Sequence, residues 1–242
     1  MDNGTFFLKR QDRTDLVGFS FVKDDLLDLY CKSNLLHSKE KSQLISHKFN
    51  NRKLSYLLGR ITSKLAIGQI FHVEDFTSIL ITKGVFGFPV VKNIPTNIQV
   101  SISHCDNIGL AVAFDEEHPL GIDLERIDRK RKDLLLTQIT EKEIELILSN
   151  ELTLLVGATL VWTAKEALSK VIKTGMTLDF KFMEVKSIEK VGTTYTSKFQ
   201  HFSQYKAISS VVSNIACSLV LPKKTEASLQ QFWSSLEHTV LH

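Results

Sequence analysis

The sequence of 242 residues predicts an α+β fold made of two α/β halves. Short runs rich in β-branched residues alternate with longer stretches whose apolar residues recur at helical spacing, in the order helix, strands, helices, strands. No stretch rich in Gly, Ser or Pro divides the chain, so we expect the halves to meet near residues 113–119 through a close interface rather than a flexible tether.

The first half is expected to contain one long helix followed by strands. From Ser38 to Ile67, apolar residues at helical spacing alternate with Lys and Arg, which indicates an amphipathic helix with a basic face. The helix should end near Gly68, and the glycines and proline of residues 83–89 indicate a loop. Three strands of one sheet are then expected at residues 98–103, 108–114 and 120–125.

Two helices are expected in the second half. Thr140 and Glu143 have the spacing of a capping box, in which each side chain accepts from the other's backbone amide, so a helix should run to about Leu148. Asn150 is the expected N-cap of a longer helix over residues 151–173, which Gly175 would end. Further strands are expected at residues 179–187 and 210–220.

Composition excludes several classes of protein. Hydrophobic residues make up 43% and charged residues 24%, as in ordinary globular chains, and the net charge of +3 is too small to indicate nucleic-acid binding. Cys31, Cys105 and Cys217 lie too far apart for a zinc knuckle or a disulfide framework. The cysteine pattern fits a reducing cytoplasm. With no leader pattern and no apolar run of about 20 residues, we expect a soluble, unexported protein that does not bind membranes. We also expect a monomer.

Asp123 and Glu125 are two residues apart in an apolar strand, so both side chains should point to one face. Neighbouring carboxylates raise each other's pKa unless water or a cation separates them. Taken alone, the pair is more typical of a solvated edge strand neutralised by Arg126 and Arg129 than of a metal site.

A second cluster changes that interpretation. Helical spacing places Trp162, Glu166, Ser169 and Lys170 on one stripe. The segment before them, residues 152–161, is almost wholly apolar, which indicates a buried helix rather than a surface Glu-Lys pair. Buried charges are costly unless they are paired with each other or with a ligand. Three carboxylates of this kind suit Mg²⁺, which binds a few carboxylates and the phosphates of a substrate.

His104 is the most suggestively placed of the eight histidines, because it ends a predicted strand directly after Ser103. It fits a hydrogen-bonded turn histidine and a functional residue equally well. No G-x-S-x-G elbow surrounds Ser103, which argues against a serine hydrolase.

Together these pieces resemble the 4′-phosphopantetheinyl transferase superfamily, in particular its double-length type that activates nonribosomal peptide and polyketide synthases. The chain carries Ser103-His104, then Gly121-Ile122-Asp123-Leu124-Glu125, then the run from Trp162 to Lys170. The last two match the family's G-[IV]-D-x-E and W-x-x-K-E-x-x-x-K patterns in the right order. Weaker similarity covers most of the remaining chain.

The resemblance implies a pseudo-dimer of two similar α/β halves, residues 1–115 and 116–242, with the active site in the cleft between them. The first half would contact the nucleotide end of coenzyme A, and the second would hold Mg²⁺ and contact the carrier protein. The reaction implied is transfer of 4′-phosphopantetheine from coenzyme A to a serine of an apo acyl, peptidyl or aryl carrier, as in siderophore or antibiotic biosynthesis. The product besides the holo carrier would be 3′,5′-ADP.

The resemblance also assigns residues. Asp123, Glu125 and Glu166 would ligate Mg²⁺, while Glu166 and Lys170 would be catalytic. One departure is Phe88, which stands where the family commonly has the Lys of Gly-Lys-Pro, so this contact is either missing or supplied by another residue such as Lys83 or Lys92. The residues implied to contact coenzyme A are Arg60, Lys64, Ser103, His104, Asp123, Lys165 and Lys170.

Two other classes of function stay open on the sequence. A Mg²⁺-dependent hydrolase of a nucleotide diphosphate such as coenzyme A would use the same carboxylates with water as the nucleophile. A non-catalytic module that binds coenzyme A or a carrier would need none of them. The complete acidic set argues against the second.

Overall fold

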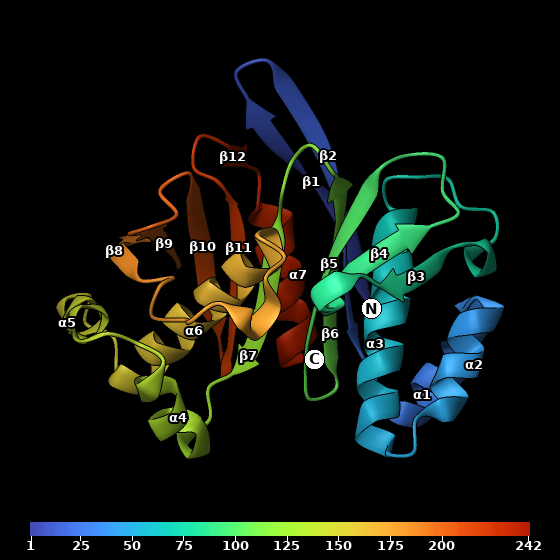
Figure 1. Ribbon diagram of the computed structural model, residues 1–242, viewed down its shortest axis with the longest axis horizontal. Coiled ribbons are helices and arrows are strands. Elements are labelled where there is room, and N and C mark those ends of the chain that lie inside the picture. Colours follow the sequence, from blue (N-terminus) through green and yellow to red (C-terminus); the bar gives the residue numbers. More distant parts are fainter. The chain divides into compact units, whose positions relative to one another are not determined.

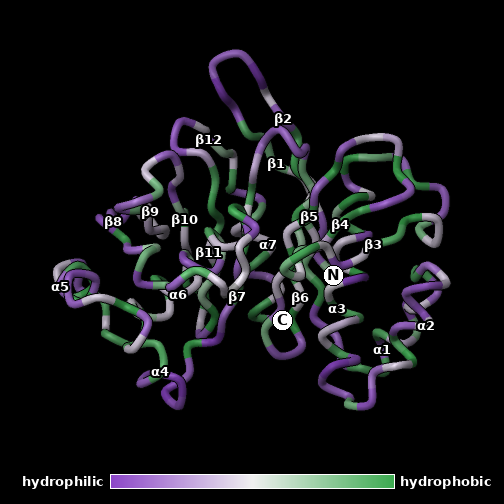
Figure 2. Tube along the Cα trace, in the orientation of Figure 1, coloured by the Kyte–Doolittle hydropathy of each residue, from purple (hydrophilic) through white to green (hydrophobic). Residues whose placement is uncertain are grey.

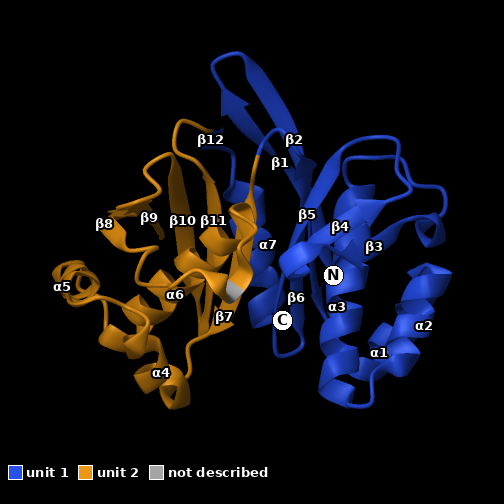
Figure 3. Ribbon diagram, viewed as in Figure 1, with its two compact units in different colours: residues 1–118, 226–242 blue, residues 119–225 orange. Residues whose placement is uncertain are grey.

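The computed structural model describes residues 1–175 and 177–242 in full, and only the backbone of Met176. The chain forms two compact units (Figure 3). Unit 1 comprises residues 1–118 and 226–242, and unit 2 comprises residues 119–225. The division after His118 lies three residues beyond the predicted one at residue 115, and the last 17 residues return to unit 1 rather than belonging to the second half.

Unit 1 contains a five-stranded antiparallel sheet with strand order β12-β1-β2-β6-β5 (Figure 1). A long hairpin that the sequence did not predict supplies β1 and β2, and its tip at Gln11-Asp12 is hydrophilic (Figure 2). The strands predicted at 98–103 and 108–114 are confirmed as β5 and β6. The five strands of the sheet are β1 (Asp2–Arg10), β2 (Arg13–Lys23), β5 (Ile98–Cys105), β6 (Ile108–Asp115) and β12 (Glu226–Ala227).

Helices cover both faces of this sheet because the residues of β2 alternate between them. Phe19 and Phe21 pack their rings against Phe232 of α7 (Gln230–Leu241), with ring centroids 5.4 and 5.2 Å apart. Gly18 faces α3 (Asn50–Gly68) on the other side, so closely that a Cβ there would overlap the carbonyl oxygen of Ala66. The central strands of this sheet, β2 from Val17 to Val22 and β6 from Ile108 to Phe114, are therefore buried on both faces.

The single helix predicted over Ser38–Ile67 is wrong: α2 (Ser38–Ser46) and α3 are separated by an extended segment. His47 and Phe49 have extended backbones, and Phe49 is the N-cap of α3. The predicted loop at residues 83–89 is confirmed as the turn of a small hairpin. The remaining elements of unit 1 are α1 (Leu26–Cys31), β3 (Leu80–Lys83), β4 (Pro89–Lys92) and the 3₁₀ turns at Lys32–Leu35, Phe76–Ser78 and Val85–Gly87.

Unit 2 also contains a five-stranded antiparallel sheet, with strand order β7-β11-β10-β9-β8. The strand predicted at residues 120–125 is confirmed as β7 (Gly121–Arg126), but the prediction that it shares a sheet with the strands at 98–103 and 108–114 is wrong, because β5 and β6 belong to the sheet of unit 1. The strand predicted at 210–220 is wrong, because a turn at Ser213-Asn214 divides it, and the one predicted at 179–187 begins only at Val185. The other strands are β8 (Val185–Val191), β9 (Thr194–Phe199), β10 (Tyr205–Val212) and β11 (Ile215–Pro222).

Three helices belong to unit 2: α4 (Lys132–Thr137), α5 (Glu141–Ser149) and α6 (Leu154–Val171). The capping box of Thr140 and Glu143 is present at the start of α5. Thr153, rather than Asn150, caps α6, because Asn150 is the residue that ends α5. Among the described residues no single helix is both long and apolar enough to cross a bilayer; α5 and α6 pass that test only as a pair bent by 118°.

The two units repeat the same order of elements. Strand β2 is followed by three helices, a hairpin, β5 and β6, and β7 is followed by three helices, a hairpin, β10 and β11. Strand adjacency repeats as well, as β2-β6-β5 in unit 1 and β7-β11-β10 in unit 2. The chain is therefore α+β with two topologically similar units, while the predicted cleft between the halves stays a prediction.

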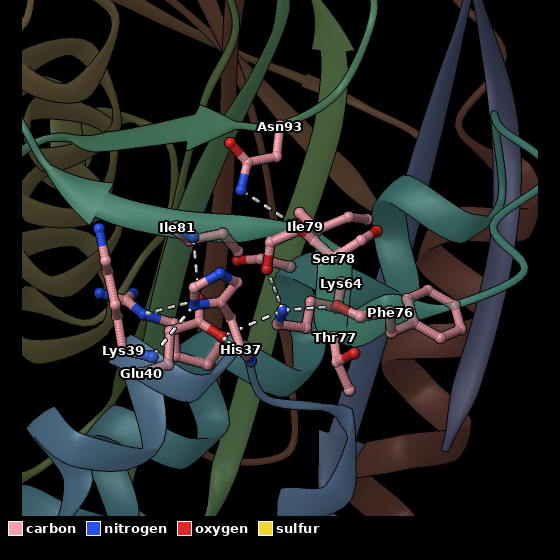
Figure 4. A network of polar contacts seen from close by, with 12 residues as sticks. His37, Lys39, Glu40, Lys64, Phe76, Thr77, Ser78, Ile79, Ile81 and Asn93 are labelled. Atoms are coloured by element: carbon pink, nitrogen blue, oxygen red, sulfur yellow. Dashed lines mark hydrogen bonds and ion pairs between the residues drawn. The ribbon is translucent and has the colours of Figure 1, made fainter.

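A buried lysine joins the helices of unit 1 (Figure 4). Lys64 of α3 is fully buried and pairs with Glu40 of α2, with 3.0 Å between Nζ and Oε2. Its ammonium also donates to the carbonyl oxygen of Phe76 at 2.8 Å, and Glu40 accepts from the amide of Ile81 at 2.9 Å. Because Glu40 also accepts from the amide of His37, one carboxylate fixes the start of α2, the side of α3 and β3 together.

We predict that Gly121→Ala lowers the free energy of unfolding by about 1–3 kcal/mol, because a Cβ at Gly121 would overlap the carbonyl oxygen of Ala167 in α6. Chemical denaturation followed by circular dichroism measures the change. Gly59→Ala is the control: its Cβ would lie 3.3 Å from Ile102 Cγ2, and we expect a change below about 1 kcal/mol. Equal stability of the two variants would contradict the close approach.

Candidate active site

Asp123 and Glu125 lie on the face of β7 that carries α6. Gly121, Asp123 and Glu125 alternate with Ile122 and Leu124, which are fully buried. Since Gly121 is in contact with the backbone of α6, the two carboxylates that follow at intervals of two point to the same side. The prediction that both share one face is confirmed.

The stripe predicted on α6 meets these carboxylates. Lys170 Nζ lies 2.8 Å from Asp123 Oδ1 and also donates to the carbonyl oxygen of Ile122 at 2.8 Å. About two helical turns before Lys170, Trp162 Nε1 donates to Glu125 Oε1 at 3.1 Å. Lys170 thus forms an ion pair and a hydrogen bond with β7. This argues against the alternative interpretation, in which Glu166 and Lys170 form a pair on the surface of the helix.

Glu166 sits between these contacts on the same stripe and is electrostatically coupled to them. Burial raises the pKa of Glu166 to about 7, and the negative charges of Asp123 and Glu125 add to the rise. The positive charges of Lys170 and Arg131 oppose it. The three predicted carboxylates are therefore within electrostatic reach of one another, and the third gains its charge only near neutral pH.

Arg131 is the residue that sequence reasoning missed at this site. Its guanidinium forms an ion pair with Glu125, with Nη1 on Oε2 and with 3.3 Å between Nη2 and Oε1. The sequence assigned this neutralising role to Arg126 and Arg129, which are closer along the chain. Arg131 was not identifiable because a 3₁₀ turn, Arg129–Arg131, brings it back toward the strand end.

The donor set fits a magnesium ion in chemistry and charge. Three carboxylates offer the hard oxygen ligands that Mg²⁺ prefers. Burial, together with the charges of Asp123 and Glu125, raises the pKa of Glu166, and a cation would oppose that rise. Within the described residues, no three His, Cys, Asp or Glu side chains already converge on one point. Asp123 and Glu125 are instead turned toward Lys170 and Arg131.

Lys165, which was expected to contact coenzyme A, is fully buried and is paired with a carboxylate outside the predicted site. Its Nζ pairs with Glu143 Oε2 of α5 at 2.8 Å and donates to the carbonyl oxygen of Gln138 at 3.0 Å. Burial lowers the pKa of Lys165, and the charge of Glu143 opposes that shift. Glu143 also accepts from the amides of Thr140 and Val185, so this pair repeats in unit 2 what Lys64 and Glu40 do in unit 1.

The other predicted contacts to coenzyme A belong to unit 1. Lys64 forms its buried ion pair with Glu40. Arg60 is also buried, with its Nε 3.7 Å from Glu40 Oε1 and its guanidinium 4.7 Å from the ring centroid of Tyr56. On β5, Ser103 is buried and His104 is exposed. The structure thus brings together Asp123, Glu125, Glu166 and Lys170 in unit 2, whereas Arg60 and Lys64 are held within unit 1.

A buried chain of three hydroxyl groups lies beside β7. Ser218 of β11 pairs in register with Asp123, and its Oγ lies 2.7 Å from Thr163 Oγ1 and 2.7 Å from Ser209 Oγ. Thr163 belongs to α6, so the chain links helix and sheet beside the carboxylates. This chain of hydroxyl groups was not predictable from the sequence, because isolated Ser and Thr residues in strands and helices are common.

A partly apolar hollow of about 290 Å³ opens beside Trp162. The indole stacks on Phe180 with ring centroids 4.6 Å apart, while its Nε1 holds Glu125. Trp162 therefore has one edge at the carboxylates and its face at this hollow. The lining residues are Leu134, Gln138, Trp162, Leu178, Asp179 and Phe180.

We predict that Lys165→Met lowers the free energy of unfolding by about 3–5 kcal/mol, because it leaves the charge of Glu143 buried without its counter-ion. Adding Glu143→Gln should restore part of the loss, since the amide oxygen still accepts a backbone hydrogen bond. Denaturant titration measures both. The exposed Lys142→Met is the control, within about 0.5 kcal/mol of the parent. If Lys165→Met matched this control, the buried pair would not support the fold.

The raised pKa of Glu166 predicts an unusual dependence of stability on pH. The folded chain binds this proton more tightly than the unfolded chain, whose pKa is near 4.5, so stability falls as the pH rises from about 4.5 to 7. Glu166→Gln has no charge to bury. In EDTA we therefore expect it to exceed the parent in stability by on the order of 3 kcal/mol at pH 8.5 and by little at pH 4.5. A difference independent of pH would contradict this prediction.

Comparisons with known proteins found a family model, a curated relative and a solved structure that are similar to part of this chain. Residues 119–220 match the family model of the 4′-phosphopantetheinyl transferase superfamily (ACPS). The holo-[acyl-carrier-protein] synthase of Acholeplasma laidlawii (strain PG-8A) is 29% identical over 105 residues, which are 40% of this chain and 88% of that protein. The crystal structure of Thermotoga maritima holo-[acyl-carrier-protein] synthase is similar over 44% of this chain and 67% of that one, with a TM-score of 0.33 and 19% identity. Residues 119–220, the part of the chain that carries Asp123, Glu125 and Glu166, are thus similar in sequence to the 4′-phosphopantetheinyl transferase superfamily.

Proposed function

We propose that the protein transfers the 4′-phosphopantetheine arm of coenzyme A to a serine of an apo carrier protein. The observation that carries the proposal is the gathering of Asp123, Glu125, Glu166 and Lys170 on two adjoining elements of the unit that matches the superfamily. The curated relative is named as a synthase of the holo acyl carrier protein, which supports the same chemistry.

Asp123, Glu125 and Glu166 would hold Mg²⁺ in this proposal. When bound, the ion would neutralise charge on the diphosphate of coenzyme A, which in phosphoryl transfer is most of what an active site contributes. Lys170 adds a second positive charge within hydrogen-bond distance of Asp123. Its ammonium also donates to the carbonyl oxygen of Ile122, which supports a role for Lys170 in stabilising the leaving phosphate.

Glu166 is the proposed base that takes the proton of the attacking serine, directly or through water. A general base is most effective when its pKa lies near the working pH, and that of Glu166 is raised to about 7. The attack forms the bond from serine oxygen to the β-phosphorus and breaks the bond to the α-phosphate oxygen, which leaves as 3′,5′-ADP. Proton, phosphoryl group and leaving group are thereby balanced without a further reactant.

The double-length type is also part of the proposal, supported by the repeated order of elements in the two units. Ser103 and His104 would contact the nucleotide end of coenzyme A. Lys83 and Lys92 are exposed on the hairpin β3–β4, where either can replace the lysine absent at Phe88. We propose Lys181 and Lys186, both exposed, as contacts to an acidic carrier of the peptide or polyketide type.

Incubation with coenzyme A, Mg²⁺ and a panel of apo carriers tests the proposal. Transfer adds about 340 Da to a carrier, whereas the alternative, hydrolysis of coenzyme A at the same carboxylates, adds nothing. Intact-protein mass spectrometry distinguishes the two. Release of 3′,5′-ADP without a labelled carrier would favour the hydrolase.

We predict that Glu166→Ala and Asp123→Ala each reduce transfer by at least about 100-fold while the circular dichroism spectrum is unchanged. Glu189→Gln, which removes a carboxylate exposed on β8, is the matched control and should label carriers at the parental rate. Initial rates by mass spectrometry measure all three. Substantial transfer to a carrier by either alanine variant would contradict the assignment of the site.

A further inference from the structure

We propose that Arg131 is the built-in counter-ion of the carboxylate site: its guanidinium holds Glu125 when no divalent cation is present and competes with a cation for the same carboxylate oxygens. The inference rests on the metal site of the proposed function. It concerns a residue that lies outside the sequence motifs and that acts on metal affinity rather than on the reacting atoms.

The first support is the geometry of the pair. Two nitrogens of Arg131 face the two oxygens of Glu125, and Trp162 donates to one of those oxygens as well. The oxygens that a cation would need are thus already engaged by donors. Glu125 is 20% exposed and Arg131 is 35% exposed, so the pair is partly shielded from water and stronger than an ordinary surface ion pair.

The second support is the way in which the backbone delivers Arg131 to this position. After β7, the amide of Ile127 donates to the carbonyl oxygen of Asn214 at 2.8 Å, which holds the strand end to β11. The Asp128 side chain then accepts from the amide of Lys130 at 2.9 Å and starts the 3₁₀ turn. The turn returns the sixth residue after Glu125 to the same carboxylate, so the pair does not depend on a long flexible loop.

The third support is the charge of the site as a whole. Three carboxylates face two cationic side chains, Lys170 on Asp123 and Arg131 on Glu125. Both cations act on Glu166 as well, because both lower the pKa that burial raises. A divalent cation that binds these carboxylates therefore adds positive charge where Arg131 already neutralises Glu125. Lys170 also donates to the carbonyl oxygen of Ile122, and Arg131 meets Glu125 with two of its nitrogens.

Competition of this kind has a direct thermodynamic signature. Removing the guanidinium should free the Glu125 oxygens and remove positive charge from the site, and both effects favour a cation. We therefore expect Arg131→Gln to bind Mn²⁺ at least about fivefold more tightly than the parent chain does. Arg131→Lys keeps the charge but loses the two-pronged geometry, and should lie between them.

Isothermal titration of Mn²⁺ into the full chain without coenzyme A measures these affinities. Arg129→Gln is the matched control, because it removes the same charge from an exposed position of the same 3₁₀ turn. We expect its affinity to equal that of the parent. In a Trp233→Phe background, the fluorescence of Trp162 gives a second readout, since this indole shares the Glu125 oxygens.

Equal effects of Arg131→Gln and Arg129→Gln would overturn the inference, because they would show general charge rather than competition for Glu125. Unchanged or weaker binding by both Arg131 variants would also overturn it, and so would the absence of binding in every form. The Lys variant keeps the test decisive if Arg131→Gln unfolds. Tighter binding by Arg131→Gln in a protein that labels no carrier would leave the inference standing and count against the proposed function.

Discussion

The direct packing of α6 on β7 is the constraint on which the candidate site depends. Gly121 has no side chain to separate the strand from the carbonyl oxygen of Ala167, so helix and strand approach closely. That contact sets the height of Glu166 over the carboxylates of β7. On its other side, α6 is fixed by the buried pair of Lys165 and Glu143, and a fixed helix can hold charged side chains in place.

The same packing occurs in unit 1 without a carboxylate site. There Gly18 lies against Ala66, and Lys64, two residues before Ala66, pairs with Glu40. In unit 2, Lys165 is likewise two residues before Ala167 and pairs with Glu143. The positions that follow the glycine at intervals of two are Ser20 and Val22 in unit 1, and Asp123 and Glu125 in unit 2. Shared architecture therefore accounts for the scaffold, and a few side chains account for the chemistry.

Local signals in the sequence predicted part of this arrangement. The alternation around Asp123, the stripe of α6 and the capping box of Thr140 are periodic or short-range patterns, and the structure confirms each. Long-range pairing was not predictable: the hairpin β1–β2 and helix α7 contact each other from opposite ends of the chain. The ion pair of Lys165 was not predictable either, because its motif places it beside Glu166 whereas helical rotation turns it toward Glu143. Its contact with coenzyme A stays a prediction.

The central claim is that Asp123, Glu125 and Glu166 form one cation site. Anomalous diffraction from crystals soaked in Mn²⁺ tests it most directly, because the ion is located independently of catalysis. The account predicts a single strong peak bounded by these three carboxylates, with the guanidinium of Arg131 moved off Glu125. A peak elsewhere, or Arg131 still paired with Glu125 beside a bound ion, would contradict it.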